Sequence, residues 1–338
     1  MPPRRRQAEA TAPRRWPAIL LVLAGLALAL VSARIATTHV PGADHDGWGL
    51  AMGLMIFIMA SGLTLTFGLM DVLNFGHGAF IAVGAFVAAS VMLALGPWMA
   101  ASSAGLNLSA VGIAILAAMA VSGVLGWAFE RIVVRPVYGQ HLKQILITTG
   151  GLIVAEQLLK VIWGPEQITL TRPEALRGAF LLGDIAVEKY RVLAVVIGLA
   201  VFAALALTLN RTRIGLLIRA GVENGEMVEA LGYRIRRLFV GVFVAGSALA
   251  GLGGAMWGLY QEVVTAAIGG QVIVLVFIVI IIGGLGSVGG CFVGALLVGL
   301  TANYVGFLAP KVALGSNILL MALVLLWRPQ GLYPVAKR

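Results

Sequence analysis

The chain has 338 residues, of which 60% are hydrophobic and only 11% are charged, and its mean hydropathy is +0.99. This is more apolar surface than a soluble core of this size can hide, so the composition predicts a polytopic membrane protein of the all-α class. The formal net charge of +10 comes from Lys and Arg in short loops between apolar runs, where such residues set membrane topology. We therefore exclude nucleic acid as a partner. The single cysteine, Cys291, excludes an intramolecular disulfide and a multi-cysteine metal site.

The chain begins with a basic segment, residues 1–16, which we interpret as a cytoplasmic tail. The apolar run that follows is longer than the core of a secretory signal, so we expect a retained first helix over residues 17–37. A single transmembrane domain is expected over residues 17–334.

Nine more apolar runs follow, and together with the first they predict a bundle of about eight to ten membrane segments. The runs lie at 48–68, 72–95, 109–130, 145–163, 192–209, 238–260, 268–285, 289–308 and 313–327. If every run crosses, the basic clusters fall on one side of the membrane, which the positive-inside rule identifies as the cytoplasm. Both termini are then cytoplasmic, and the longest polar loop on the opposite side is residues 164–190.

Two joints between these runs are unusual. Only Leu69, Met70 and Asp71 separate the second and third runs, and the sequence GGLGSVGG at 283–290 separates the eighth and ninth. Each joint is either a tight turn at the interface or a broken or re-entrant helix beside a path through the membrane, because non-helical backbone at membrane depth must be satisfied by protein or water. Similar small-residue patterns follow both joints, AFIAVGAFVA and CFVGALLVGL, and indicate a weak internal repeat in opposite membrane orientation.

Polar residues are rare inside the runs, and Asn74 and His77 stand out because such groups are costly in hydrocarbon. They are three positions apart, so they share a face if the segment is helical, and Gly78 allows another helix to approach closely. They either line a solute path or form an interhelical hydrogen bond that fixes packing. Gly284 and Gly286 at the second joint are candidates for the same path.

A basic, polar segment at residues 211–237 interrupts the apolar pattern. In it, Glu223, Glu226 and Met227 would share one side of a short helix that ends at Leu231 and Gly232. An ordinary positive-inside loop explains the arginines but not this spacing, so we predict that a cytoplasmic partner binds here. Elsewhere, Arg131 and Arg135 are interpreted as topological anchors and headgroup contacts.

Five segments together resemble the permease family of LIV-type ABC importers. They are NFGHGAF, residues 135–164, residues 219–254, IIGGLGSVGGCFVGALLVG and RPQGLYP, which occur in the expected order between residues 48 and 334. The chain looks like the H-type permease of these systems. Many members carry an acidic residue directly after the His-Gly pair, where this chain has Ala79, and this difference leaves the substrate open.

The resemblance implies one half of an importer in the bacterial inner membrane. This chain and a second permease, an M-type paralogue, would form the path; two cytoplasmic ATPases would drive it; and a periplasmic binding protein would deliver a branched-chain or other amino acid to the loop at 164–190. Related systems carry urea or short amides. Residues similar to the coupling motif of ABC importers, with their charged neighbours, make up the expected ATPase contact: Arg219, Glu223, Glu226, Glu229, Ala230 and Gly232.

The chain has no G-x-x-x-x-G-K-[ST] pattern, so we expect partner subunits to hydrolyse ATP and this chain to hold no cofactor or metal. Two other classes remain as alternatives. A self-sufficient secondary carrier or channel would show acidic residues at membrane depth, but the acids Asp71, Glu130 and Glu156 lie near run ends. A membrane-embedded enzyme would show a cluster of His, Asp or Glu, whereas His77 stands nearly alone. We therefore predict a transport subunit that is not an enzyme.

Overall fold

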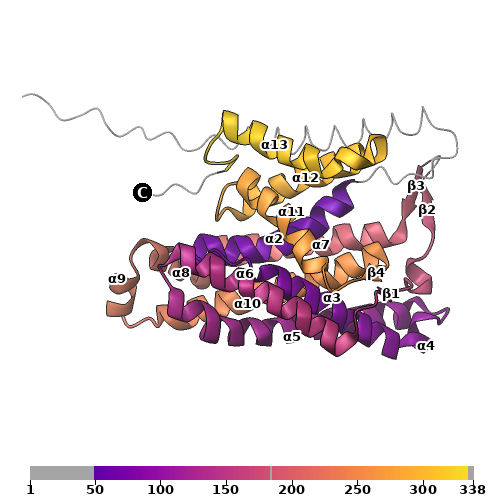
Figure 1. The fold of residues 1–338 in the computed structure, drawn as a ribbon, viewed down its shortest axis with the longest axis horizontal. Helices are drawn as coiled ribbons and strands as arrows, with labels where there is room; N and C mark the ends of the chain where they lie inside the picture. Colours follow the sequence, from indigo (N-terminus) through magenta and orange to yellow (C-terminus); the bar gives the residue numbers. More distant parts are fainter. Residues whose placement is uncertain (1–48, 183–184, 334–338) are drawn as a thin grey trace, which may run out of the picture.

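A computed structural model describes residues 49–182 and 185–333 as a bundle of helices (Figure 1). The predicted tail at 1–16 and first helix at 17–37 lie outside the described residues. Within the described part, seven helical segments are long and apolar enough to cross a membrane, and two shorter apolar helices accompany them. Each predicted run from residue 48 onward is helical over most of its length, which confirms an all-α membrane bundle.

The elements follow the apolar pattern closely. The long helices are α2 (Gly49–Met70), α3 (His77–Ala94), α5 (Ala104–Phe129), α6 (His141–Trp163), α7 (Lys189–Arg211), α10 (Ile235–Gln261), α11 (Ile268–Gly283), α12 (Val288–Leu308) and α13 (Ala313–Trp327). The short helices are α4 (Gly96–Met99), α8 (Arg213–Glu223) and α9 (Gly225–Ala230), with a π-helical turn at Glu130–Val134 and 3-10 turns at Arg135–Val137, Glu174–Leu176 and Pro310–Val312. Four short strands are β1 (Ile168–Thr169), β2 (Ala179–Leu182), β3 (Ile185–Glu188) and β4 (Val263–Val264).

Figure 1 separates the two ends of the bundle, with α8 and α9 at one end and the strands and α4 at the other. We call the first the basic end, because it carries the arginines of residues 211–237, and the second the strand end. Two antiparallel pairs form there: β1 with β4, where Ile168 faces Val264, and β2 with β3. The predicted outer loop at 164–190 is therefore structured and tied to the chain after α10.

The core lies between α2, α3, α10 and α12. Small residues bring these helices together, since a Cβ on Gly62 would collide with the carbonyl of Gly246, and a Cβ on Gly84 would collide with the backbone of Gly251. Large apolar side chains on α5, α6, α7 and α13 are exposed around this core, for example Leu116, Val161, Val196 and Leu326. A shell of this kind matches hydrocarbon, whereas a soluble protein would bury it.

The first joint is a broken helix. α2 ends at Met70, Asp71 has a left-handed backbone with φ +52°, and the chain stays non-helical until His77, so the predicted helix start at residue 72 is wrong. The Nε2 atom of His77 lies 2.9 Å from the carbonyl oxygen of Met59, which precedes the end of α2 by roughly 16 Å of helix. The segment 71–76 therefore runs back along α2, and α3 begins within the bundle.

The second joint, at 283–290, is a tight turn. The amide of Ser287 donates to the carbonyl of Gly284 at 3.1 Å, and its hydroxyl caps α12 by accepting from the amide of Gly290 at 3.0 Å. The turn is held from outside as well, because Leu332 and Tyr333 donate from their amides to the carbonyls of Ile282 and Gly283, each at 2.9 Å. Residues 332–333 of the closing motif thus pack on this turn, and the re-entrant interpretation of the joint is wrong.

A second broken joint, which the sequence did not reveal, lies between α10 and α11. Glu262 follows α10 with φ +57° and precedes the start of α11 at Ile268 by six positions, as Asp71 precedes the start of α3 at His77. α2 and α10 pack antiparallel, because Gly62 meets Gly246 while Met59 meets Gly253. The segment at residues 70–78 therefore corresponds to the segment at residues 261–269, and the helices that precede the two segments run antiparallel. The sequence pattern had instead paired the joint at residue 71 with the joint at 283–290.

Candidate functional site

The first broken joint encloses polar groups that the protein itself leaves unpaired. Asn74 is 0% exposed, and in the described part of the chain neither its Nδ2 nor its Oδ1 has a hydrogen-bond partner. The Nδ1 atom of His77 is also buried without a described partner. Because Nε2 of His77 faces the carbonyl of Met59, the neutral ring carries its proton on Nε2 and leaves an acceptor lone pair on Nδ1. The joint therefore offers one buried donor group and two acceptors to a small polar ligand or water.

The backbone of this joint is satisfied by side chains from α6. The amide of Leu73 donates to Gln144 Oε1 at 3.4 Å, and the amide of Phe75 donates to Thr148 Oγ1 at 3.1 Å. The ring of Phe75 stacks on Phe277 of α11 with centroids 4.4 Å apart. These contacts fix the unwound segment, so the unpaired groups of Asn74 and His77 cannot be attributed to a loose loop.

A second buried asparagine shows how the fold treats a purely structural amide. Asn107 is also 0% exposed, but its Nδ2 donates to the carbonyls of Trp98 and Ala101, each at 2.8 Å, and its Oδ1 accepts from the amide of Ala175 at 2.6 Å. Buried polar side chains are normally satisfied in this way. Asn74 departs from that rule at a break in a membrane helix, where solute sites of transporters are commonly built.

The predicted path glycines fall into two separate places. Gly78 lies next to the break, where a Cβ would lie 2.7 Å from the carbonyl oxygen of Gly269 at the start of α11. Gly284 and Gly286 have φ of +98° and +83° and pack at the basic end, against the backbone of Tyr333 and Gly68 respectively. The structure therefore groups Asn74, His77 and Gly78, and assigns Gly284 and Gly286 to a turn at the end of the bundle.

The predicted coupling segment is helical but not continuous. Asn224 separates α8 from α9 and caps the latter, since its Oδ1 accepts from the amide of Met227 at 2.9 Å. Glu223 ends α8, so it does not share a helix with Glu226, and that part of the prediction is wrong. The predicted stop is correct, because α9 ends at Ala230 and Gly232 has φ +88°.

The surface of α9 faces away from the bundle. Only Val228 is buried in this helix, whereas Glu226, Glu229 and Ala230 are exposed. Apolar side chains next to them are exposed too, with Met227 at 61% and Leu231 at 70%. Arg219 lies apart from this surface: its guanidinium donates to the carbonyls of Gly215 and Leu209, at 3.2 and 3.0 Å, and so ties α8 to the end of α7.

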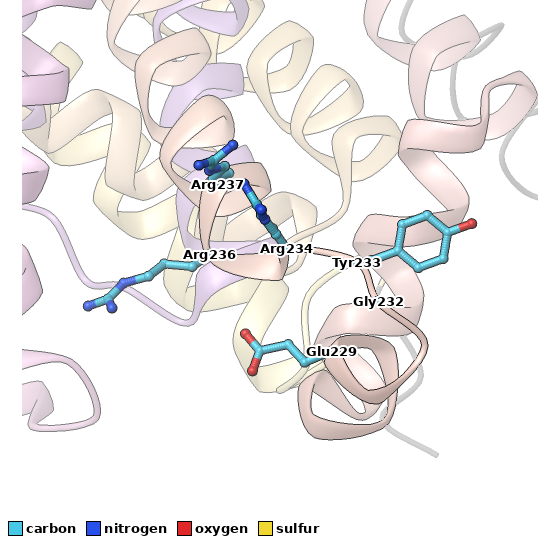
Figure 2. A pocket seen from close by; sticks show the side chains of 6 residues that line it. All are labelled: Glu229, Gly232, Tyr233, Arg234, Arg236 and Arg237. Atoms are coloured by element: carbon cyan, nitrogen blue, oxygen red, sulfur yellow. The ribbon is translucent and has the colours of Figure 1, made fainter.

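A pocket of about 370 Å³ lies between α9 and the start of α10. In Figure 2 the carboxylate of Glu229 extends to the same side of the view as the Arg236 side chain, while the Tyr233 ring extends to the opposite side. Arg236 and Arg237 leave the helix in different directions (Figure 2). The remaining lining residues are Gly232 and Arg234. A pocket that combines an acid, arginines and a glycine turn beside exposed apolar residues has the character of a protein interface.

Sequence reasoning missed a cluster at the strand end, centred on Arg172. Its guanidinium donates to the carbonyls of Leu259 and Tyr260 at the end of α10, at 3.2 and 3.0 Å. It also pairs with Glu262 at 2.8 Å and Glu188 at 3.3 Å. One cation thus links the loop 164–190 to the second broken joint. The sequence signal was an arginine in a loop of mixed charges, which does not identify its partners.

The described residues hold no group of three or more His, Cys, Asp or Glu side chains that could bind a metal ion.

Comparison with known proteins assigns this arrangement to a family. The family described as "Branched-chain amino acid transport system / permease component" matches residues 48–327. The chain is 28% identical to the high-affinity branched-chain amino acid transport system permease protein BraD of Pseudomonas aeruginosa PAO1, over 84% of this chain and 93% of that protein. It is also 28% identical to LivH of Escherichia coli K12, over 84% and 92%. The permease LivM of the same strain matches at 25%, over 84% and 69%.

The family match extends across every helix described above, and LivH of Escherichia coli K12 matches this chain at 28% identity, against 25% for LivM of the same strain. The chain therefore belongs to the family of permease components of branched-chain amino acid transport systems and resembles its H-type members.

Proposed function

We propose that this chain is one of two permease subunits of an ATP-driven importer that brings a small solute into the cytoplasm. The observation that carries the proposal is the α9 surface, where Met227 and Leu231 are exposed beside Glu226 and Glu229 on a helix outside the bundle. Exposed apolar side chains rimmed by charges are typical of a protein interface. An ATPase subunit is the partner that the family relationship suggests for this surface, with both chain termini on the same cytoplasmic side.

The solute in this proposal is a branched-chain or other amino acid, as the printed names of BraD and LivH suggest. Its path passes the broken joint, where Asn74 and His77 present unpaired groups to a ligand with its own donors and acceptors. An M-type paralogue supplies the second permease, and the similarity to LivM supports a paired origin of the two subunits. A periplasmic binding protein delivers the solute at the strand end, and ATP is hydrolysed only by the partner subunits.

Reconstitution tests this proposal. The chain, its M-type partner, the ATPases and the binding protein are placed in vesicles, and uptake of labelled leucine is followed with and without ATP. We expect uptake that requires ATP and every subunit. Uptake by this chain alone, driven by a Na⁺ or proton gradient, would instead show a self-sufficient secondary carrier and contradict the proposal.

A further inference from the structure

A second pocket at the basic end lies between the end of α5 and the start of α10 and has a volume of about 250 Å³. Arg131 and Arg135 line it from the α5 side, and Arg236 and Arg237 line it from α10. The α5 side is formed by the π-helical turn Glu130–Val134, a rare geometry that is frequently found at functional sites. Two elements far apart in the sequence thus converge on one strongly basic hollow.

The positive charge of this pocket is not balanced by the residues that the structure describes. Glu130 is the one carboxylate in the lining, which leaves an excess of three charges when four guanidinium groups are set against it. No described carboxylate lies within ion-pair distance of the four arginines. The buried carboxylate of Glu130 instead accepts a hydrogen bond from Tyr138 at 2.9 Å. Burial and then the Glu130 charge raise the pKa of Tyr138, which keeps this phenol protonated as the donor.

The start of α10 adds to the imbalance. Its first turn contains Arg236 and Arg237 and no acidic residue, and its N-cap residue, Arg234, makes no capping hydrogen bond with its side chain. The amino end of a helix carries a partial positive charge, which acidic side chains normally offset. Here cations occupy that position on a helix of 27 residues. An anion bound in the pocket would offset the repulsion between the arginines and the helix dipole and would accept hydrogen bonds from the free amides at the start of α10.

The surroundings indicate what kind of anion fits. Trp127 forms one wall, with Arg131 over its ring at 6.0 Å, a pairing suited to the membrane interface. Val124, three positions before Trp127 on α5, is 65% exposed, and Ile132, next to Arg131, is 72% exposed. A ligand with a phosphate head and acyl chains can place the phosphate among the arginines and its chains along these apolar residues.

We propose that this pocket binds the phosphate headgroup of an anionic phospholipid, a site separate from the solute path and the α9 surface. The arginines supply bidentate donors to phosphate oxygens, and the adjacent apolar face distinguishes a lipid from free phosphate. Acidic lipid of the cytoplasmic leaflet then fixes the start of α10 against the end of α5. This assignment goes beyond the proposed transport function and does not depend on the identity of the solute.

The test uses the full chain purified with the subunits it retains, delipidated in detergent and titrated with phosphatidylglycerol or with phosphatidylcholine, with bound lipid counted by native mass spectrometry. The variant R131Q/R135Q removes two charges that belong to this pocket and not to the one beside Glu229. We expect the affinity for phosphatidylglycerol to fall roughly tenfold to thirtyfold, since each basic residue near anionic lipid contributes about one factor of five. Binding of phosphatidylcholine should stay weak in all forms.

Two further variants keep the test decisive. R131K/R135K retains the charge and should retain most of the lipid binding, which separates loss of charge from loss of fold. K143Q removes an exposed cation of α6 outside the pocket and should leave lipid binding unchanged. If millimolar inorganic phosphate displaced bound phosphatidylglycerol as effectively as added phosphatidylglycerol does, the pocket would be reassigned to a soluble anion. Normal lipid binding by R131Q/R135Q with loss of the ATPase would reassign it to a protein interface, and either result would overturn the proposal.

Discussion

At the scale of single residues, the two buried asparagines Asn74 and Asn107 differ in their hydrogen bonding, so we predict opposite effects of their substitution. Asn107 has partners for its donors and its acceptor, whereas Asn74 has none among the described residues. An unpaired buried amide destabilises a fold, and removing a paired one leaves its partners unsatisfied. Stability and transport should therefore separate at these two positions.

We expect Asn74→Leu to leave the thermal stability of the detergent-purified protein unchanged or slightly raised, because no described hydrogen bond is lost, and to weaken solute uptake. Asn107→Leu should lower the free energy of unfolding by about 2 kcal/mol or more. Labelling of N74C, in a Cys291→Ala background, by a water-soluble thiol reagent would report access. Protection of this thiol by solute supports the path, while unchanged labelling, or a large loss of stability in Asn74→Leu, would assign the residue to helix packing.

The turn glycines give a second pair. Gly286 has φ +83°, and a Cβ there would lie 2.7 Å from Cα of Gly68, whereas Gly289 has open space around its Cβ position. We expect Gly286→Leu to abolish uptake with little loss of membrane insertion, because the end of α2 must move to admit the side chain. Gly289→Ala is the control and should transport normally. Wild-type uptake by Gly286→Leu would show that contact between the turn and α2 is dispensable.

At the scale of elements, Arg172 is a side chain that joins the loop 164–190 to the end of α10, beside the backbone pairing of β1 with β4. Arg172 satisfies the last carbonyls of α10 and pairs with Glu188 and Glu262, and its side chain is only 16% exposed. Arg177 makes an ion pair with Glu174 in the same loop, but both side chains are more than half exposed. Arg172 and Arg177 therefore contribute differently to stability, although both lie in the same loop of mixed charges.

We expect Arg172→Ala to lower the free energy of unfolding by about 2 kcal/mol, because it leaves the carbonyls of Leu259 and Tyr260 without this donor, while Glu188 keeps its ion pair with Arg191. Arg177→Ala should cost about 0.5 kcal/mol or less, as exposed pairs do. Thermal unfolding of both variants in one detergent checks the difference. Equal stabilities would mean that the β1–β4 pairing alone holds the second joint.

At the scale of the whole molecule, the proposed function requires force to pass from an ATPase to the path. α9 is suited to receive it, because Glu226 and Glu229 are exposed while Val228 anchors the helix in the protein. The start of α10 follows directly, and α10 packs along α2 and α3 on both sides of the broken joint. A displacement of α9 would therefore be passed along α10 and, at the contact of Gly246 with Gly62, to the α2 surface that touches His77.

We expect Glu229→Arg, alone or with Glu226→Arg, to abolish ATP-dependent uptake and retention of the ATPase while thermal stability stays unchanged. A reversed charge in an interface places like charges together and can cost several kcal/mol of binding. Glu166→Arg, an exposed reversal at the strand end, is the control and should retain the ATPase. Normal uptake and retention in Glu229→Arg would remove the coupling assignment from α9.

The sequence by itself determined the class of the fold and most of its helices. A run of about 20 apolar residues is long enough to cross a membrane as a helix. The positions of α2, α5, α10 and α12 were therefore predicted close to their observed bounds. The stop of α9 at Gly232 was also local, because only glycine takes a positive φ at no steric cost. The isolated polarity of Asn74 and His77 likewise singled out two residues that the structure buries at the first broken joint; their role in a solute path stays a prediction.

Only the tertiary structure decided where helices break and what each polar group contacts. A break in a membrane helix needs side chains from elsewhere in the chain to satisfy the freed backbone groups. Gln144 and Thr148 accept hydrogen bonds from the backbone after Asp71 in this way. The periodicity of apolar residues does not indicate these partners. For the same reason the sequence pattern related the first joint to the wrong segment. The glycine-rich residues at 283–290 form a turn, whereas the second broken segment starts at Glu262, where the sequence shows no distinctive pattern. Composition sets which segments enter the membrane, but hydrogen-bond partners far along the chain set where the backbone inside it may unwind.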